Sequence, residues 1–536
     1  MTDTPAWEAV RAELTGPAGL NMGWAAVDRH VAGGQGGRVA LRWNGRDGGK
    51  RAFTYADLAE RTNRFADALR RLGVRPGETV FTLLPRVPEL YVALLGALKA
   101  GCVAAPLYAA FGPEPLRLRL ALGKARVLVT TDTLWRRKGL PGAGFDVLTV
   151  GGNPPEGAQD LAALLEQADP RGPVAPTGPA DLALLHFTSG TTGAPKGALH
   201  VHDALVAQVA SARQALDLGP GDVYWCTADP GWVTGTVYGI LAPLACGATV
   251  VANEGDFDPA RWYGLIERQH VAVWYTTPTA IRMLMRAGDE LPGRFDLTSL
   301  RRLASVGEPL NPEAVVWGRT VLGQPFVDTW WQTETGAIML ANLDAVPGAL
   351  GRPLPGIVAD VRQPDADGVG ELVLRPPWPS LFRGYLGDEE RTGTCFAEGW
   401  YRTGDLVRRD GQGCYWFVGR ADDIVKSSGH LVGPFEVESV LLEHPAVAEA
   451  AVIGKPDPVA GEVVKAFVAL KPGIMWSDDL ASELIAHGRR RLGPALAPKE
   501  VAAAAALPHT RSGKIMRRLL KARELGLPEG DVSALE

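Results

Sequence analysis

The stretch "TVFTLLPRVPELYVALLGALKAGCVAAPLY", from Thr79 to Tyr108, places a helical pattern between two short apolar runs. The flanking runs "TVFTLLP" and "CVAAPLY" have the length and apolar character of buried strands. The middle part, "ELYVALLGALKAG", is long enough for a helix and ends at a glycine. Strand, helix and strand in this order predict two parallel strands joined by a covering helix, so we predict an α/β fold.

The segments around this unit repeat the alternation. "FTYADLAERTNRFADALRRLG" predicts a helix with Thr54 as N-cap, Asp57 in the capping position and Gly73 as the stop. Strands and helices alternate again at "VAVWYTT", "TAIRMLMRA" and "LRRLASVG". The uncharged stretch from Pro230 to Asn253 is interrupted by four glycines and Pro243. We therefore predict a buried helix and a buried strand there, rather than a helix that spans a membrane.

The pattern changes toward the C-terminus. From about Gly370 there are short strands with Gly and Pro turns, as in "GELVLRPP" and "GCYWFVG". After Asp422 a compact unit follows, with helix "PFEVESVLLEH", strands "VAEAAVIG" and "VKAFVAL", and helix "SDDLASELIAHGRRRLG". We predict a large N-terminal domain, residues 1–421, of parallel sheets covered by helices plus a β-rich subdomain. Residues 422–536 are predicted to form a small α+β lid domain.

Composition limits the classes of function. With 536 residues the chain is too long for one ordinary core, and its 46% hydrophobic and 21% charged residues are typical of a globular protein. The net charge of −5 gives no reason to expect nucleic acid as the main partner. The five cysteines are scattered without a CxxC pair, and the N-terminus lacks a signal-peptide pattern. We expect a cytoplasmic protein without disulfides, a structural zinc site or a membrane partner.

A second stretch, "HFTSGTTGAPKGALHVHDAL" from His186 to Leu205, has the composition of a phosphate-binding loop. It is not a Walker A motif, because Lys196 is followed by glycine and no hydroxyl is available after it to hold Mg²⁺. Its hydroxyl groups and its flexible glycines nevertheless suit an anion, and they come from Thr188, Ser189, Gly190, Thr191, Thr192 and Gly193. Taken alone, the stretch is equally compatible with a polar turn.

Four further motifs follow in order: "DTWWQTETG", "YRTGD", "GRADDIVKSSGHLVGPFEVE" and "LPHTRSGKIMRR". With them, nearly the whole chain resembles the adenylate-forming superfamily of acyl-CoA synthetases, peptide-synthetase adenylation domains and luciferases. Within it, "YWCTADPGWVTGTVYGILAPLACGAT" and "SVGEPLNPEA" are most similar to the acetyl-CoA synthetase family, in its shorter bacterial form. The resemblance implies a two-step ligation. Acetate attacks the α-phosphate of ATP to give acetyl-AMP and pyrophosphate, and the CoA thiol then displaces AMP.

The resemblance also implies roles for single residues. The ATP and AMP contacts fall on Thr188, Ser189, Gly190, Thr191, Thr192, Gly193, Lys196, Gly307, Glu308, Pro309, Asp328, Thr329, Trp330, Trp331, Gln332, Thr333, Asp405 and Arg420. Glu334 matches a Mg²⁺ ligand, a role that suits a carboxylate beside phosphate oxygens. Lys514 matches the catalytic lysine, which neutralises charge as the acyl–phosphate bond forms. The pocket for the acyl group falls on Val233, Thr234, Val306 and Trp331.

The second half-reaction is expected to use a moved lid. Asp422 matches the hinge, and Ser428 and Gly429 match positions beside the entering pantetheine of CoA. Lys514 then leaves the site, a form of lid gating. The resemblance further implies a lysine acetyltransferase and a deacetylase that act on Lys514, because acetylation removes the charge of its side chain.

One position departs from the family. The lid motif usually reads "SGxR", whereas this chain has Leu431 where the arginine that reaches ATP phosphate is expected. His430 and Lys426 are candidate replacements, but His is mostly neutral at pH 7 and we expect Lys426 to point elsewhere. Three alternatives to acetate ligation stay open: a ligase for propionate or another short acid, a nucleotide-binding protein with impaired adenylation, and a module that charges a separate carrier protein.

Overall fold

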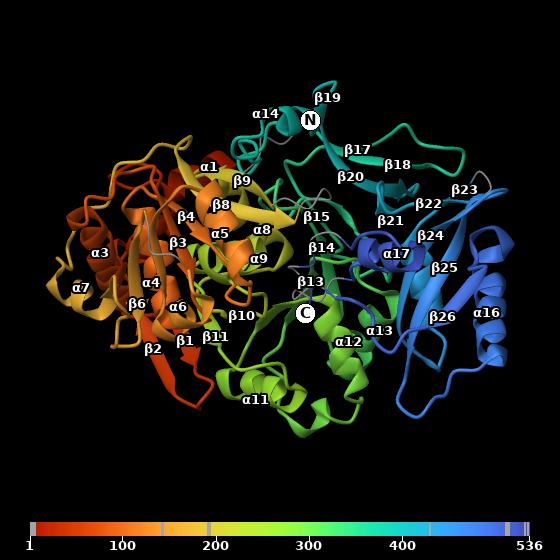
Figure 1. Ribbon diagram of the computed structural model, residues 1–536. Coiled ribbons are helices and arrows are strands. Elements are labelled where there is room, and N and C mark those ends of the chain that lie inside the picture. The colour runs from red at the N-terminus through yellow and green to blue at the C-terminus, as the bar shows by residue number, and fades with distance from the viewer. Residues whose placement is uncertain are drawn as a thin grey trace.

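The computed structural model describes residues 7–140, 144–189, 195–427, 430–509, 515–529, 532 and 535, and these residues form four β-sheets with helices between them (Figure 1). The chain runs from two helix-covered sheets at the left of the figure, through the segment around β17 to β21, to a C-terminal sheet at the right. The predicted α/β class, with its β-rich part and smaller C-terminal part, is confirmed.

The strand–helix–strand unit predicted from Thr79 to Tyr108 is present. Strand β3 (Thr79–Leu83) is followed by helix α4 (Pro88–Lys99) and strand β4 (Val103–Pro106), and the two strands pair in parallel. Helix α3 (Tyr55–Arg71) precedes them and begins with the predicted capping box. The Thr54 side chain accepts from the Asp57 backbone N–H, while the Asp57 carboxylate accepts from the Thr54 N–H.

Around this unit lies a seven-stranded sheet in the order β7-β6-β5-β3-β4-β8-β9. Its other strands are β5 (Ala125–Thr131), β6 (Asp146–Val150), β7 (Ala158–Asp160), β8 (Leu182–Ser189) and β9 (Pro195–Val201). Helices α5 (Pro113–Leu122), α6 (Asp132–Lys138) and α7 (Leu161–Gln167) connect them. The edge strand β9 is antiparallel to β8, and this hairpin carries the stretch predicted to bind phosphate.

A nine-stranded sheet has the order β16-β15-β14-β13-β12-β10-β11-β1-β2. Its strands are β1 (Val39–Asn44), β2 (Lys50–Thr54), β10 (Val223–Cys226), β11 (Thr249–Asn253), β12 (Val273–Thr276), β13 (Arg302–Val306), β14 (Phe326–Trp330), β15 (Leu340–Ala341) and β16 (Arg352–Pro353). The central strands β11, β10, β12, β13 and β14 pair in parallel, so their carboxyl ends meet at one edge.

Helices on this part of the chain are α1 (Trp7–Leu14), α2 (Arg29–Ala32), α8 (Ala204–Ala215), α9 (Val233–Thr236), α10 (Ala242–Ala245), α11 (Pro259–Gln269), α12 (Pro278–Arg286) and α13 (Pro312–Val321). Between α9 and α10 the turns widen into a π-helical segment, Val237–Leu241, so the stretch from Pro230 to Asn253 is the predicted buried helix and strand. Among the described residues no helix is both long and apolar enough to cross a membrane.

The third sheet consists of β17 (Ala359–Arg362), β18 (Val369–Leu374), β19 (Phe396–Ala397), β20 (Trp400–Arg409) and β21 (Tyr415–Arg420), with helix α14 (Glu389–Thr394) beside it. It begins at Ala359, earlier than the change of pattern near Gly370 indicates. β17 to β20 form an antiparallel sheet, and β21 pairs with β20 so that Asp405 lies opposite Arg420.

The C-terminal sheet contains β22 (Val425–Ser427), β23 (His430–Val432), β24 (Val447–Asp457), β25 (Gly461–Leu470) and β26 (Glu500–Ala503). Helices α15 (Pro434–Leu442), α16 (Asp478–Leu496) and α17 (Arg517–Leu525) accompany it. This unit has its own apolar core, which includes Val437, Leu441 and Val464. A separate core suits the predicted lid, while the boundary at Asp422 stays a prediction.

Candidate active site

A cavity of about 380 Å³ opens where the carboxyl ends of β13 and β14 meet the C-terminal unit. This is the place where ligands bind in open α/β sheets. The predicted nucleotide and acyl positions that line it are Val233, Thr234, Val306, Gly307, Glu308, Pro309, Asp328, Thr329, Trp330, Trp331, Gln332, Thr333, Asp405 and Arg420. The fold therefore gathers positions that are up to 187 residues apart, from Val233 to Arg420, around one space.

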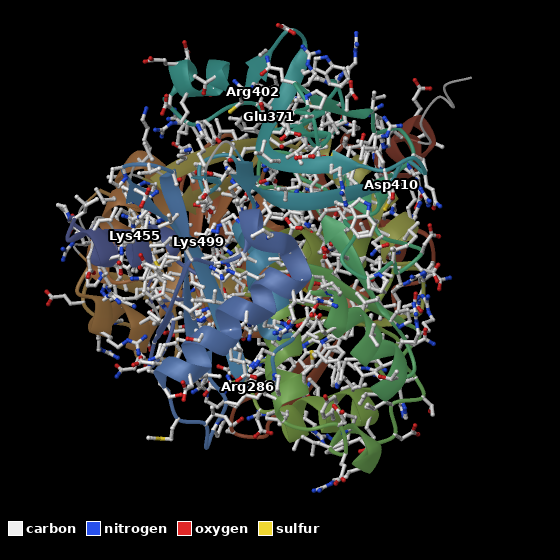
Figure 2. The ribbon with its side chains drawn as sticks, turned by 90° about the vertical axis from the view of Figure 1, so that its right-hand side faces the viewer. Arg286, Glu371, Arg402, Asp410, Lys455 and Lys499 are labelled. Carbon is white, nitrogen blue, oxygen red and sulfur yellow. The ribbon has the colours of Figure 1, made fainter. Side chains whose placement is uncertain are left out.

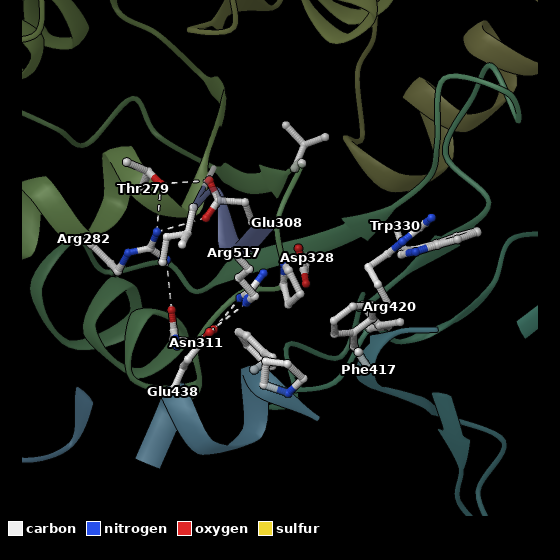
Figure 3. Close-up of a pocket in the computed structure, with 18 of the residues that line it drawn as sticks. Thr279, Arg282, Glu308, Asn311, Asp328, Trp330, Phe417, Arg420, Glu438 and Arg517 are labelled. Atoms are coloured by element: carbon white, nitrogen blue, oxygen red, sulfur yellow. Dashed lines mark hydrogen bonds and ion pairs between the residues drawn. The ribbon is translucent and has the colours of Figure 1, made fainter. Parts of the chain in front are cut away.

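The C-terminal unit supplies the opposite wall. Glu438, Glu449 and Arg517 line the cavity, as do His509 and Ile515, which precede and follow Lys514 in the sequence. Lys514 itself lies outside the described residues. Arg517 is held toward the cavity because its guanidinium donates to the Glu438 carboxylate at 2.9 Å (Figure 3).

A cluster that no sequence motif predicts fixes Glu308 at the cavity (Figure 3). Thr279 Oγ1 donates to Glu308 Oε1 at 2.8 Å, and Arg282 pairs with Glu308 Oε2 at 3.0 Å. The same guanidinium donates to Asn311 Oδ1 at 3.1 Å. Thr279 and Arg282 come from α12, so this helix holds the segment after β13 in place.

Asp328 is a buried carboxyl group at the cavity, with 3% of its surface exposed. It accepts backbone N–H groups from Thr329 at 3.0 Å and from Leu310 at 3.3 Å. Burial raises its pKa to about 8, because these two hydrogen bonds do not offset the cost of a buried charge. The group is consequently mostly neutral at pH 7.

Asp405 is also buried, but three side chains hold it. Trp330 Nε1 and Gln332 Nε2 both donate to its Oδ2 at 3.0 Å, and Arg420 Nη1 donates to Oδ1 at 2.9 Å. Burial alone would lower the pKa of Arg420, yet the carboxylates of Asp405 and Asp422 raise it. The geometry thus presents a carboxylate and a cation side by side at one end of the cavity.

The predicted acyl wall is anchored from behind. Trp331 Nε1 donates to the Tyr275 hydroxyl at 3.3 Å, and that hydroxyl bonds Thr329 Oγ1 at 2.7 Å. Thr329 in turn donates to the Ser305 carbonyl at 2.7 Å. The ring of Tyr238 packs edge-on against the indole, with centroids 5.1 Å apart. These contacts fix one orientation of Trp331, and nothing in the linear sequence indicates Tyr275 or Tyr238.

The phosphate-loop and metal candidates form a second group next to Thr333. Thr188 pairs with Lys196 across the β8–β9 hairpin, and Ser189 is the last residue of β8. The Lys196 ammonium lies 5.3 Å from the ring centroid of Tyr385, whose hydroxyl donates to Glu334 Oε1 at 2.6 Å. Burial, and then the charge of Glu334, raise the pKa of Tyr385, so its hydroxyl stays a donor. Gly190, Thr191, Thr192, Gly193, Ser428 and Gly429 lie outside the described residues.

The donor set at Glu334 fits Mg²⁺ better than a metal held by protein ligands alone. Within the described ranges, no three His, Cys, Asp or Glu side chains come together as a metal cluster. Mg²⁺ usually takes only one or two carboxylates and fills its other positions with water and substrate phosphates. Glu334, beside the hairpin that carries the phosphate-loop stretch, offers such a carboxylate.

Known proteins with similar chains place this geometry in a family. Residues 28–386 match the family described as AMP-binding enzyme, and residues 436–514 match the AMP-binding enzyme C-terminal domain. An acetyl-coenzyme A synthetase of Bacillus subtilis (strain 168) is 46% identical over 96% of this chain and 93% of its own.

Two solved structures are similar along nearly their full length. The Brucella canis acyl-CoA synthetase has a TM-score of 0.74 at 36% identity, covering 97% of both chains. A benzoate CoA ligase from Burkholderia xenovorans LB400 has a TM-score of 0.83 at 30% identity, covering 94% of this chain and 99% of the other. The chain therefore belongs to the AMP-binding enzyme family and, within it, to the family of acetyl-coenzyme A synthetases.

Proposed function

We propose that this protein joins acetate to CoA at the expense of ATP, through an acetyl-AMP intermediate, with release of pyrophosphate and AMP. The observation that carries the proposal is one cavity with two kinds of lining. Asp405 and Arg420 lie side by side in it, and Trp331, Val233 and Val306 form an apolar part of its wall. A nucleotide and a very small acyl group suit these two regions. The names of the related acetyl-coenzyme A synthetases support the same reaction.

The family resemblance assigns the nucleotide contacts, and the chemistry of the lining suits them. The adenine is surrounded by Gly307, Glu308, Pro309, Trp330 and the buried Asp328, all of which line the cavity. The Asp405 carboxylate accepts ribose hydroxyls, since a carboxylate is the acceptor-only group that suits them. Arg420 adds a fixed cation near the ribose and phosphates. Thr333 donates to the α-phosphate, and the loop from Thr188 to Gly197 holds the β- and γ-phosphates.

Glu334 would hold Mg²⁺ together with the phosphate oxygens of ATP. When bound, the ion would supply neutralisation of the negative charge that develops on the triphosphate. The protein's own part is to provide the Glu334 carboxylate and the Lys196 ammonium, which both contact Tyr385, at the phosphate end of the site. Phosphoryl-transfer sites of this kind depend on positioning and charge rather than on a covalent enzyme group.

Lys514 supplies the remaining cation in the first half-reaction. Support comes from His509 and Ile515, which precede and follow Lys514 in the sequence and line the cavity. We infer that the lid then turns about Asp422 and brings Ser428 and Gly429 to the entering CoA. Loss of the Lys514 charge by an acetyltransferase, and its return by a deacetylase, would switch the first half-reaction.

The test is ATP–pyrophosphate exchange with and without acetate, followed by CoA-dependent release of AMP. Acetate-dependent exchange is the expected result, whereas exchange that ignores acetate and propionate would contradict the proposal. Lys514→Ala should nearly abolish exchange and spare thioester formation from supplied acetyl-AMP, because the lysine is absent from the second step. Equal loss in both half-reactions would remove Lys514 from this role.

A further inference from the structure

Tyr385 contacts two groups of opposite charge at the phosphate end of the site. Its hydroxyl donates to Glu334 Oε1 at 2.6 Å, and the Lys196 ammonium lies 5.3 Å from the centroid of the same ring. The side chain is 8% exposed, so both contacts are shielded from water. Neither the phosphate-loop stretch nor the "DTWWQTETG" motif includes this tyrosine.

The backbone fixes where the ring stands. The segment around Tyr385 runs beside strand β9, where the Leu386 N–H donates to the Gly197 carbonyl at 2.7 Å. The same segment holds the Glu334 backbone, because the Phe382 N–H donates to the Glu334 carbonyl at 2.9 Å. The segment that contains Tyr385 thus connects the hairpin β8–β9 to the loop after β14 through backbone hydrogen bonds.

The ring also keeps two charges apart. Lys196 and Glu334 touch the same side chain, yet they make no ion pair with each other. Glu334 Oε1 is occupied by the phenol, and Oε2 has no hydrogen-bond partner among the residues that the structure describes. The ring attracts the ammonium through its π face. Each charge is held in place and still available to a ligand.

We propose that Tyr385 is a positioning residue for the triphosphate of ATP and its divalent metal ion. The phenol orients the Glu334 carboxylate toward the metal, and the ring prevents Lys196 from neutralising that carboxylate in the empty enzyme. This inference rests on the proposed function. It assigns a role at the phosphate end of the site to a residue that lies outside the sequence motifs.

The first experiment measures metal binding without turnover. Mn²⁺ is titrated into the enzyme with α,β-methylene ATP, which cannot be cleaved at the reacting bond, and free Mn²⁺ is counted by electron paramagnetic resonance. Tyr385→Phe removes only the hydroxyl and should weaken Mn²⁺ binding about 10- to 100-fold, the usual effect of losing a group that orients a metal ligand. Tyr415→Phe is the control, because it removes a similarly buried hydroxyl that bonds the Ala359 carbonyl and does not line the cavity.

The outcome is read together with the second half-reaction. Tyr385→Phe should convert supplied acetyl-AMP and CoA at the parental rate, since no triphosphate takes part. Parental Mn²⁺ affinity in Tyr385→Phe would overturn the inference, and so would equal damage to the thioester step, which indicates a merely structural role. A parent enzyme without acetate-dependent pyrophosphate exchange would instead contradict the proposed function.

A second variant tests the ring. Tyr385→Leu removes the π face as well as the hydroxyl, so Lys196 becomes free to pair with Glu334. Binding of metal-free α,β-methylene ATP should then fall severalfold below that of Tyr385→Phe, because the phosphates must compete with the carboxylate for the ammonium. Equal affinity of the two variants would overturn the part of the proposal that concerns Lys196.

Discussion

Two buried carboxyl groups line the cavity, and their surroundings give them different chemistry. Asp405 faces Arg420 and two side-chain N–H donors, whereas the contacts that lower the pKa of Asp328 are two backbone N–H groups. Burial therefore dominates at Asp328 and raises its pKa from 3.8 to about 8. The folded protein therefore holds the Asp328 proton more tightly than the unfolded chain does. This proton contributes fully to the free energy of unfolding below the pKa of the unfolded chain, and the contribution is lost as the pH rises through the pKa of the folded protein.

Asp328→Asn should change how stability depends on pH. Between pH 5.5 and pH 7.5 the parent should lose about 1.4 kcal/mol per pH unit relative to the variant, because asparagine has no charge to bury. A constant offset is also expected, since the amide nitrogen cannot accept the N–H bond that the carboxyl group accepts. Urea denaturation of the free protein at the two pH values measures the slope. If the free energy of unfolding changes equally with pH in the two proteins, the raised pKa of Asp328 is contradicted.

We predict that Trp331 limits the size of the acyl pocket. Trp331→Gly should open the recess to butyrate and longer acids and weaken the use of acetate, while the parent should use propionate poorly and butyrate not at all. An acid that is one methylene too short for its pocket loses only about 1–3 kcal/mol of binding free energy. An acid that is too long is excluded more strongly, because its atoms overlap the pocket wall. Steady-state kcat/KM values for acetate, propionate, butyrate and hexanoate test this. A parent that already prefers hexanoate would refute the pocket assignment.

Tyr275→Phe should relax the same selectivity without removing the wall. The Trp331 N–H then loses its acceptor, and Thr329 Oγ1 loses a donor, so the indole is held only by packing against Tyr238. The ratio of kcat/KM for propionate over acetate should rise by up to about tenfold, the range of one neutral hydrogen bond. Tyr263→Phe is a matched control, because its buried hydroxyl has no hydrogen-bond partner in the described part of the chain. An unchanged ratio in Tyr275→Phe would mean that packing alone fixes the indole.

At the scale of elements, local sequence patterns predicted the features that depend on residues close together in the chain. The capping box of α3, the β3–α4–β4 unit and the buried stretch from Pro230 to Asn253 are confirmed, because caps, periodicity and apolar runs act over a few residues. Tyr385 and Tyr275 escaped prediction for the opposite reason. Tyr385 lies between glycines and charged residues and Tyr275 in an apolar strand, and each meets Glu334 or Trp331 only through the tertiary fold.

Strand pairing bears on one expectation about the lid. The β22–β23 hairpin places Lys426 directly opposite position 431, while the direction of its side chain stays a prediction. Opposite residues of an antiparallel pair lie on the same face of the sheet. A sequence read without its register cannot reveal this neighbour, so Lys426 becomes the candidate cation at the position where leucine replaces the family's arginine.

Lys426→Ala should therefore raise the KM for ATP severalfold, and adding Leu431→Arg to it should restore the parental value. Leu431→Arg alone should lower the KM for ATP or raise the adenylation rate, by less than the roughly ten- to hundredfold of an uncompensated charged hydrogen bond. Pyrophosphate exchange at varied ATP gives both values, and conversion of acetyl-AMP should stay unchanged. If Lys426→Ala leaves the KM for ATP unaltered, the lysine does not replace the arginine.

At the scale of the whole molecule, the C-terminal unit rests on α12 and α13 through a few polar contacts. Arg286 of α12 pairs with Glu449 of β24 at 3.4 Å, and within the C-terminal unit His509 Nε2 lies 3.0 Å from the same carboxylate. Asn311 Nδ2 donates to Ser439 Oγ of α15 at 3.1 Å. In Figure 2, Arg286 lies at the border between the C-terminal unit and the helices below it. Among the described residues these polar contacts are partly exposed, which suits the lid rotation that we propose.

The Arg286–Glu449 pair should favour the adenylation step through the orientation of the lid. The His509 hydrogen bond is the main cause that lowers the pKa of Glu449, so the carboxylate is charged at neutral pH and its contribution is lost only as the pH falls through that lowered value. Because both partners are partly exposed, the pair is worth at most about 1 kcal/mol, or about fivefold in rate. Arg286→Gln and Glu449→Gln should each slow pyrophosphate exchange by up to that factor and leave thioester formation unchanged.

The double variant decides whether the two residues act together. If the ion pair is the cause, Arg286→Gln with Glu449→Gln should be no slower than either single variant, because the contact can be lost only once. The difference from the parent should also shrink at high salt, since screening weakens partly exposed charges. Arg268→Gln is the control, as this exposed arginine of α11 has no ion pair among the described residues. Additive losses that persist in salt would show that the side chains act on the substrate from the cavity wall and do not hold the lid.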